Sequence, residues 1–236
     1  MKFILLMIIG AGFSACSSYE RAFVSLERLP VQATVSNTEM DSLVAPYRRA
    51  LAIEMNRIIG TAVSDMQVAR PNSPMGQWVA DVLLAYGKDS LVPANDRELP
   101  VIAILNTGGL RASFSQGAIT VGDVYKLMPF DNLLVAVKLP VEKLSEIREY
   151  LKTTGGEPIA GFRIVKGELV TDLPLADARF FWVITTDFLA NGGDKMYFFQ
   201  SAAQKIPTAL TLRDLLLKEV AVQQVINVRL EERVQF

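Results

Sequence analysis

Short apolar runs alternate along this chain with longer segments in which apolar residues recur at helical spacing. The apolar runs at 101–105 and 180–184 are typical of buried strands, and each leads into a glycine pair. The segment 141–152 instead places apolar residues on one face, which predicts an amphipathic helix. Further strands are predicted at 31–35, 61–68, 133–139 and 225–230, with a hairpin at 162–170 that turns at Lys166-Gly167.

Residues with special backbone preferences mark the ends of other predicted helices. Thr38 begins the sequence Thr-Glu-Met-Asp, and we expect it to cap a helix that runs to about residue 59. Ser73-Pro74 is a good start for a second helix, which Gly87 ends. Two more helices are expected, one at 210–220 and a short one ahead of Phe130.

Strands and helices mix along the chain without strict strand–helix–strand alternation. This order predicts an α+β fold in which a mixed β-sheet is flanked by helices. The chain has 236 residues, 50% of them hydrophobic, which is enough for one or two ordinary domains. We expect a signal segment at 1–15, a polar tether at 16–37 and one folded domain at 38–236.

The first residues have the pattern of an export signal. Met1-Lys2 gives a positive start, and the apolar stretch at 3–13 is too short to cross a bilayer but fits the core of a signal peptide. With Cys16, the single cysteine of the chain, this resembles a bacterial lipoprotein signal in which that cysteine is acylated. An ordinary signal peptide with an incidental cysteine is the alternative. The lipoprotein interpretation predicts a lipid-anchored protein of the bacterial cell envelope, with the outer membrane favoured and the folded part in the periplasm or at the cell surface.

Charge and histidine content argue against several classes of function. Lys and Arg together number 24 against 25 Asp and Glu, without a basic stripe, so no nucleic-acid polymer is expected as a partner. The chain contains no histidine, and it has no Ser-x-x-Lys, Gly-x-Ser-x-Gly or P-loop pattern. We therefore predict no catalytic residue, metal ligand or cofactor in this chain.

The two glycine pairs stand in loops whose other residues suit a ligand. One loop reads N-T-G-G-L-R at 106–111 and the other F-L-A-N-G-G-D at 188–194, each after an apolar strand. Paired glycines let the backbone turn sharply and let a ligand come close. Phe188 offers a flat apolar face, and Asp194 offers two acceptor oxygens suited to a vicinal diol. The alternative is a turn whose ring belongs to the core and whose carboxylate is solvated.

Together with the segment between them, these loops resemble the C-terminal, substrate-binding domain of the 5′-nucleotidase/UDP-sugar hydrolase family. The matching motifs, in the family's order, are N-x-G-G-[LI]-R at 106–111, I-T-x-x-[DN]-V…P-F-[DG]-N at 119–132 and F-L-A-N-G-G-D at 188–194. A weaker match at 71–81 resembles the family's E-S-x-[LM]-G-N-[LW]-x-A-D helix start. The resemblance extends from about residue 40 to the C-terminus and implies the family's α+β fold.

The resemblance also implies roles for individual residues. Two Phe rings clamp the nucleobase in the family, and here they would be Phe130 and Phe188, with Asp194 binding the ribose. Asn106 and Arg111 would face the phosphate, which a guanidinium fork suits. The alternatives are that Phe130 is a core residue and that Arg111 pairs with a nearby acid. The other residues expected at the substrate site are the remaining loop positions and an arginine ahead of the weaker motif: Gly108, Gly109, Asn191, Gly192, Gly193 and Arg70.

Complete family members carry an N-terminal metallophosphatase domain whose His and Asp side chains hold two metal ions. Because this chain has no histidine, the resemblance implies only the nucleoside- or nucleotide-binding half of a split 5′-nucleotidase-type phosphohydrolase, inactive alone. Its expected partner is a separate metallophosphatase subunit that carries the divalent metals. Two alternatives stay open: a non-catalytic nucleoside- or nucleotide-binding surface lipoprotein, and a degenerate domain whose pocket no longer binds.

Overall fold

The computed structural model describes residues 37–171 and 178–236. The chain divides into two compact units, residues 1–44 and residues 45–236, and nearly all of the described residues belong to the second. The predicted signal segment, the predicted strand at 31–35 and Cys16 lie outside the described residues. Within the described ranges, no helix is both long and apolar enough to cross a membrane.

Helix α2 (Thr38–Met55) differs from its prediction at both ends. The backbone N–H of Met40 donates to Oδ1 of Asn37 at 3.2 Å, so the side chain that caps the helix belongs to Asn37 rather than to Thr38. The helix ends at Met55 and not near residue 59, because the chain from Ile58 onward pairs in a β-sheet. None of its residues is buried.

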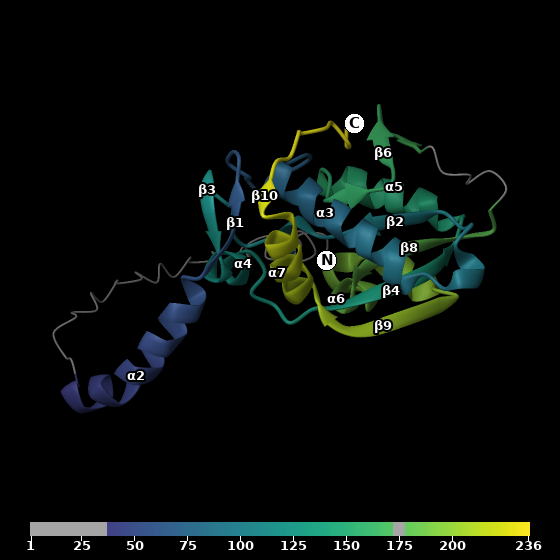
Figure 1. Ribbon diagram of the computed structural model, residues 1–236. Helices are drawn as coiled ribbons and strands as arrows, with labels where there is room; N and C mark the ends of the chain where they lie inside the picture. The colour runs from purple at the N-terminus through teal and green to yellow at the C-terminus, as the bar shows by residue number, and fades with distance from the viewer. Residues whose placement is uncertain (1–36, 172–177) are drawn as a thin grey trace, which may run out of the picture. The chain divides into compact units, whose positions relative to one another are not determined.

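A five-stranded mixed sheet forms the centre of the second unit (Figure 1). Strands β2 and β8 run parallel, and the other neighbouring pairs are antiparallel. With helices packed against it, this sheet confirms the predicted α+β fold with a mixed sheet. In sheet order the strands are β5 (Ile159–Ala160), β2 (Val101–Ile104), β8 (Phe180–Thr186), β4 (Leu133–Pro140) and β9 (Gln204–Thr211).

A three-stranded sheet and a hairpin complete the β structure of the described part. The strand predicted at 61–68 lies earlier, at 58–62, while the hairpin turns at Lys166-Gly167 as predicted. The smaller sheet has the order β10 (Val225–Ile226), β1 (Ile58–Ala62) and β3 (Gly117–Thr120), and the hairpin consists of β6 (Arg163–Val165) and β7 (Glu168–Val170).

Three strands, β3, β5 and β9, were not predicted. β3 and β5 are short, and neither has a clear apolar run of its own. β9 is an edge strand that contains Pro207, and a proline cannot donate a ladder hydrogen bond, so its sequence does not read as a strand. Its sheet pairing with β4 comes from tertiary contacts that local periodicity does not contain.

Helices cover the main sheet and bury their apolar faces against it. Helix α3 begins as predicted, since Oγ of Ser73 accepts the N–H of Gly76 at 3.0 Å, and it packs on β2, β5 and β8 (Figure 1). Ile147 and Leu151 are fully buried from the predicted amphipathic helix. The helices of the second unit after α2 are α3 (Pro74–Tyr86), α4 (Val121–Leu127), α5 (Lys143–Thr154), α6 (Asp187–Ala190) and α7 (Leu212–Gln223), with shorter turns at Gly87–Leu91, Ala94–Asp96, Thr107–Gly109, Gly193–Lys195 and Tyr197–Ser201.

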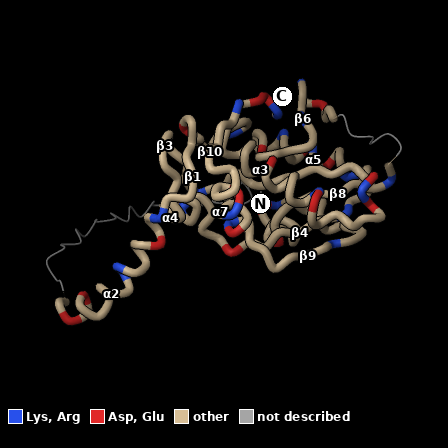
Figure 2. The backbone as a smooth tube through the Cα atoms, viewed as in Figure 1, with Lys and Arg blue, Asp and Glu red and all other residues tan. Residues whose placement is uncertain are grey.

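Positive and negative residues are interspersed along the second unit (Figure 2). Several partly buried ion pairs fasten loops to the sheet and helices. Lys138 on β4 lies 2.7 Å from the carboxylate of Asp96, and Arg233 near the C-terminus lies 2.6 Å from that of Asp81 on α3. These charges therefore join segments that are far apart in the sequence.

The sheet order brings three loops to one edge. Because β2 and β8 are parallel neighbours, the glycine loops that follow them leave the sheet on the same side. β4 runs antiparallel to β8, with Leu134 opposite Thr186, so the loop that precedes β4 arrives at this edge as well. The three sequence motifs lie on these three loops.

Candidate functional site

A cavity of about 310 Å³ lies where the three loops meet. Its volume is at the lower end of the range usual for small-molecule sites. It is lined by Asn106, Gly108, Gly109, Arg111, Phe130, Asn132, Phe188 and Asp194. The structure thus brings together residues from the three motifs, which are separated by up to 88 positions.

The first glycine loop supplies an amide and a guanidinium. Its backbone turns through a short 3₁₀ segment, in which the N–H of Gly109 donates to the carbonyl of Asn106 at 3.1 Å. A Cβ at Gly109 would stand 2.7 Å from Oδ1 of Asn106, so a larger residue would displace that side chain. Arg111 folds back to the carbonyl of Gly108 at 3.2 Å, and among the described residues no carboxylate lies within ion-pair distance of it. Among the described residues, Arg111 therefore has no ion pair of the kind that the alternative requires.

Phe130 and Phe188 are half-exposed rings of the cavity rather than core residues. Phe130 is 43% exposed and Phe188 46%, whereas buried aromatic residues such as Phe181 have almost no exposure. The alternative that either ring belongs to the core is therefore wrong. Exposed apolar rings in a concave site mark a place where a flat apolar group can bind.

One carboxylate holds the backbone of both ring-bearing segments. Oδ1 of Asp187 accepts the N–H of Phe188 at 2.8 Å and the N–H of Leu133 at 3.0 Å. Leu133 begins β4, directly after the loop that carries Phe130. Asp187 thus has a structural role, and it is not among the residues that line the cavity.

The second glycine loop supplies the carboxylate of Asp194. Oδ2 of Asp194 accepts Nδ2 of Asn106 at 2.5 Å, which links the two glycine loops. Gly193 lies so close to the ring of Phe188 that a Cβ there would be 2.5 Å from it. This glycine is therefore required for the present position of the ring, although it does not line the cavity.

Tyr150 supports Asp194 from α5. Its hydroxyl donates to the backbone carbonyl of Asp194 at 3.1 Å, and its ring meets Phe198 edge-on at 5.7 Å. Burial, and then the charges of Glu157 and Asp194, raise the pKa of Tyr150 to about 12, against a smaller opposing effect of Arg70. The phenol therefore stays protonated and can donate at all ordinary pH values.

Arg70 does not line the cavity, but the buried carboxylate of Glu157 connects it to the loop that does. Its Nε donates to the carbonyl of Gly156 at 2.9 Å, and its Nη2 lies 2.6 Å from Oε1 of Glu157. The other oxygen of Glu157 accepts the N–H and the hydroxyl of Thr107, at 2.6 and 2.7 Å. Glu157 thus connects Arg70 to the first glycine loop, and it was not among the residues predicted from the sequence.

Two further predicted site residues of the second glycine loop lie outside the cavity, and one residue that lines the cavity was not predicted. Asn191 and Gly192 do not line the cavity. Gly192 has a φ of +93°, which favours glycine, and Asn191 closes α6 through its N–H to the carbonyl of Asp187 at 3.0 Å. Asn132 lines the cavity but was not predicted. Its place in the P-F-[DG]-N motif, two residues after Phe130, is the signal that could have found it.

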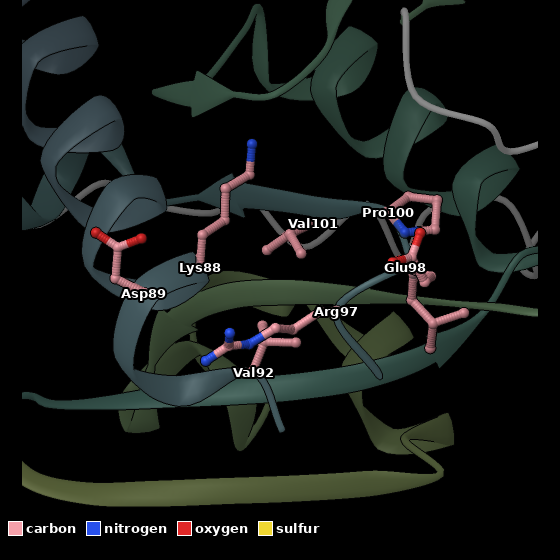
Figure 3. Close-up of a pocket in the computed structure, with 8 residues that line it drawn as sticks. Lys88, Asp89, Val92, Arg97, Glu98, Pro100 and Val101 are labelled. Carbon is pink, nitrogen blue, oxygen red and sulfur yellow. The ribbon is translucent and has the colours of Figure 1, made fainter. Parts of the chain in front are cut away.

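A second, larger cavity of about 580 Å³ lies elsewhere on the same unit (Figure 3). Lys88 and Asp89 reach it from the turn after α3, and Arg97 and Glu98 from the loop before β2. None of its described lining residues is aromatic, and none of them is a predicted site residue. We therefore do not place the candidate site there.

The chemistry of the smaller cavity suits a ligand with three parts. Half-exposed rings can stack on a planar group, the carboxylate can accept hydroxyl hydrogens, and the guanidinium can pair with an anion. Within residues 37–171 and 178–236, no group of three His, Cys, Asp or Glu side chains could hold a metal ion.

Proteins of known sequence with related segments include two from Bacillus subtilis (strain 168). Endonuclease YhcR is 30% identical over 96 residues, which is 39% of this chain and 7% of that protein. The trifunctional nucleotide phosphoesterase protein YfkN is 30% identical over 131 residues, which is 53% of this chain and 8% of that protein. The chain therefore spans only a small part of these relatives.

Solved structures show the same fold. The 5′-nucleotidase precursor from Thermus thermophilus superposes with a TM-score of 0.67 at 23% identity, over 85% of this chain and 43% of that one. The NAD nucleotidase (NadN) of Haemophilus influenzae gives 0.60 at 20% identity, over 85% and 41%. The model of the 5′-nucleotidase C-terminal domain matches residues 57–202, more than half of the chain. The chain therefore belongs to the 5′-nucleotidase C-terminal domain family.

Proposed function

We propose that this chain is the nucleoside- or nucleotide-binding half of a split 5′-nucleotidase-type phosphohydrolase. The observation that carries the proposal is the cavity that Phe130, Phe188 and Asp194 share. Two rings suit a base, the carboxylate suits a ribose diol, and Arg111 suits a phosphate. Membership in the 5′-nucleotidase C-terminal domain family supports the same ligand class.

The catalytic half belongs to a separate metallophosphatase subunit that carries the divalent metals, and this chain alone is inactive. The absence of histidine supports this assignment, since imidazole is both the commonest ligand of zinc-type ions and the ready proton-transfer group near neutral pH. Cys16 anchors the protein to the bacterial envelope, preferentially at the outer membrane, as a lipoprotein whose signal is residues 1–15.

Calorimetric titration of the full chain in detergent tests the binding function. Adenosine and AMP should bind saturably, and Phe188→Ala should weaken both about five- to 150-fold, the range expected for losing one stacking ring. Phe236→Ala is the matched control, because that ring is 48% exposed and does not line the cavity. Absence of heat with either ligand, or equal losses in both variants, would contradict the binding function.

Partner dependence tests the split-enzyme part. The chain alone should release no phosphate from AMP, whereas a complex recovered under mild extraction should do so with added divalent metal. Phosphate release by the purified chain would overturn the assignment of catalysis to a partner. Tight AMP binding with no co-purifying metallophosphatase would instead favour the non-catalytic binding lipoprotein.

A further inference from the structure

Arg213 lies at the N-terminus of a helix, where a positively charged side chain is unfavourable. It is the second residue of α7, directly after Leu212, and Thr211 caps this helix through its side chain. The N-terminus of a helix carries a partial positive charge, so acidic residues such as the neighbouring Asp214 are preferred there. A residue that breaks a local preference in an otherwise regular element indicates a role elsewhere.

The contacts of Arg213 lie on the loop that carries Phe130. One terminal nitrogen, Nη1, lies 3.5 Å from the carbonyls of both Met128 and Phe130. The other, Nη2, pairs with the carboxylate of Asp131. The guanidinium also stacks over the ring of Tyr125 on α4, 4.6 Å from its centroid. Only 12% of the Arg213 side chain is exposed, whereas the side chain of its ion-pair partner Asp131 is 81% exposed.

The middle of this loop has few other backbone bonds. At its start the N–H of Met128 donates to Val124, and at its end the N–H of Leu133 donates to Asp187. The carbonyl of Asn132 accepts the N–H of Leu212. Pro129 has no N–H, and among the described residues the backbone of Phe130 is bonded by Arg213 alone.

We propose that Arg213 is a positioning residue for nucleobase binding, which fixes the loop so that the Phe130 ring is held in place in the cavity before a base arrives. The proposal rests on the proposed function of this site. Phe130 has no ring partner within the described part of the chain, so its backbone sets its direction. A ring that is already fixed stacks without the ordering cost that a mobile one must overcome.

Two variants and a control separate this role from a general effect on folding. Arg213→Gln removes both the positive charge and the planar guanidinium group, whereas Arg213→Lys keeps the charge and removes the planar group with its several N–H donors. Lys218→Gln removes a cation from the exposed side of the same helix and is the control. Each full-length protein is titrated with adenosine and with ribose 5-phosphate, which lacks the base. Hydrogen exchange of the Leu133 and Leu212 amides, which hold the end of this loop, is measured in parallel.

Arg213→Gln should weaken adenosine binding roughly five- to tenfold, part of what a full stacking contact contributes, and leave ribose 5-phosphate binding unchanged. Arg213→Lys should restore only part of the loss, and Lys218→Gln should bind as the wild type does. In a Phe130→Ala background, Arg213→Gln should cause no further loss, because the residue acts through that ring. An equal loss in both backgrounds, or for both ligands, would overturn the proposal.

The exchange measurement keeps the two proposals apart. Faster exchange of the Leu133 and Leu212 amides in Arg213→Gln, with slow exchange retained in β8, is the expected result. If wild-type protein bound no adenosine, the proposed function would fail, while faster local exchange would still support the fixing of the loop by Arg213. Unchanged exchange at these amides would overturn the positioning role whatever the ligand result.

Discussion

Asn106 donates from Nδ2 to Oδ2 of Asp194 at 2.5 Å, which joins two glycine loops separated by 88 positions. The loops follow parallel neighbouring strands, so the bond closes one side of the cavity at the sheet edge. Oδ1 of Asp194 has no hydrogen-bond donor among the described residues. One oxygen thus orients the carboxylate and leaves the other for a ligand hydroxyl.

Asp194→Ala should remove discrimination between ligands with and without a ribose diol. Wild-type protein should bind adenosine about 1.5–3 kcal/mol more tightly than 2′,3′-dideoxyadenosine, the usual value of hydrogen bonds to a charged group. The variant should bind the two with similar, weak affinity in calorimetric titrations. Asp89→Asn is the control, since that residue is exposed and lies outside the lining of this cavity. An unchanged preference for adenosine in Asp194→Ala would contradict the diol role.

Phe130→Ala should weaken binding of adenosine and uridine alike. Base–aromatic stacking contributes about 1–3 kcal/mol per base and depends little on base identity, because every base has a π-face. The free energy of unfolding should change by about 0.5 kcal/mol or less, since the ring is half exposed. Titration with both nucleosides and urea unfolding measure the two effects. A large loss of stability without a change in affinity would show a packing role instead.

The site could be predicted from the sequence to the extent that its residues lie within local motifs. Phe130, Phe188 and Asp194 stand in short motifs next to strands, and the sheet edge brings those motifs together. Asn132 was missed although it lies in one of these motifs. Its side chain has no unusual feature in the sequence, and its position in the cavity follows from the path of the loop.

The supporting residues could not be predicted, because their partners are distant along the chain. Glu157 reaches Arg70 across 87 positions and Thr107 across 50. Arg213 contacts a loop more than 80 positions away. Strand β9 likewise depends on its pairing with β4. Periodicity reports local structure, whereas these features depend on tertiary contacts.

Glu157→Ala should destabilise the protein by about 2–4 kcal/mol, because it leaves the N–H and hydroxyl of Thr107 without their acceptor and Arg70 without its ion pair. Urea unfolding measures the loss. Glu146→Ala is the matched control, since its pair with Lys143 is exposed and i,i+3 on a helix surface, where such pairs contribute little. Equal effects of the two substitutions would show that the Glu157 network does not hold the loop.

Tyr150 should make the protein less stable as pH rises above 10. Its pKa is raised from 10.0 to about 12 in the folded protein by burial, Glu157 and Asp194. Between these values the folded protein retains a phenol proton that the unfolded chain has lost, so the unfolded chain binds fewer protons and stability falls with pH. Below pH 10 both states keep the proton, and the contribution is fully present.

The free energy of unfolding of Tyr150→Phe should therefore depend less steeply on pH between 10 and 12 than that of the wild type. At neutral pH the variant should be less stable by about 0.5–1.5 kcal/mol, because it loses one hydrogen bond to the backbone carbonyl of Asp194. Identical pH slopes in the two proteins would mean that the phenol of Tyr150 is not shielded at this edge of the cavity.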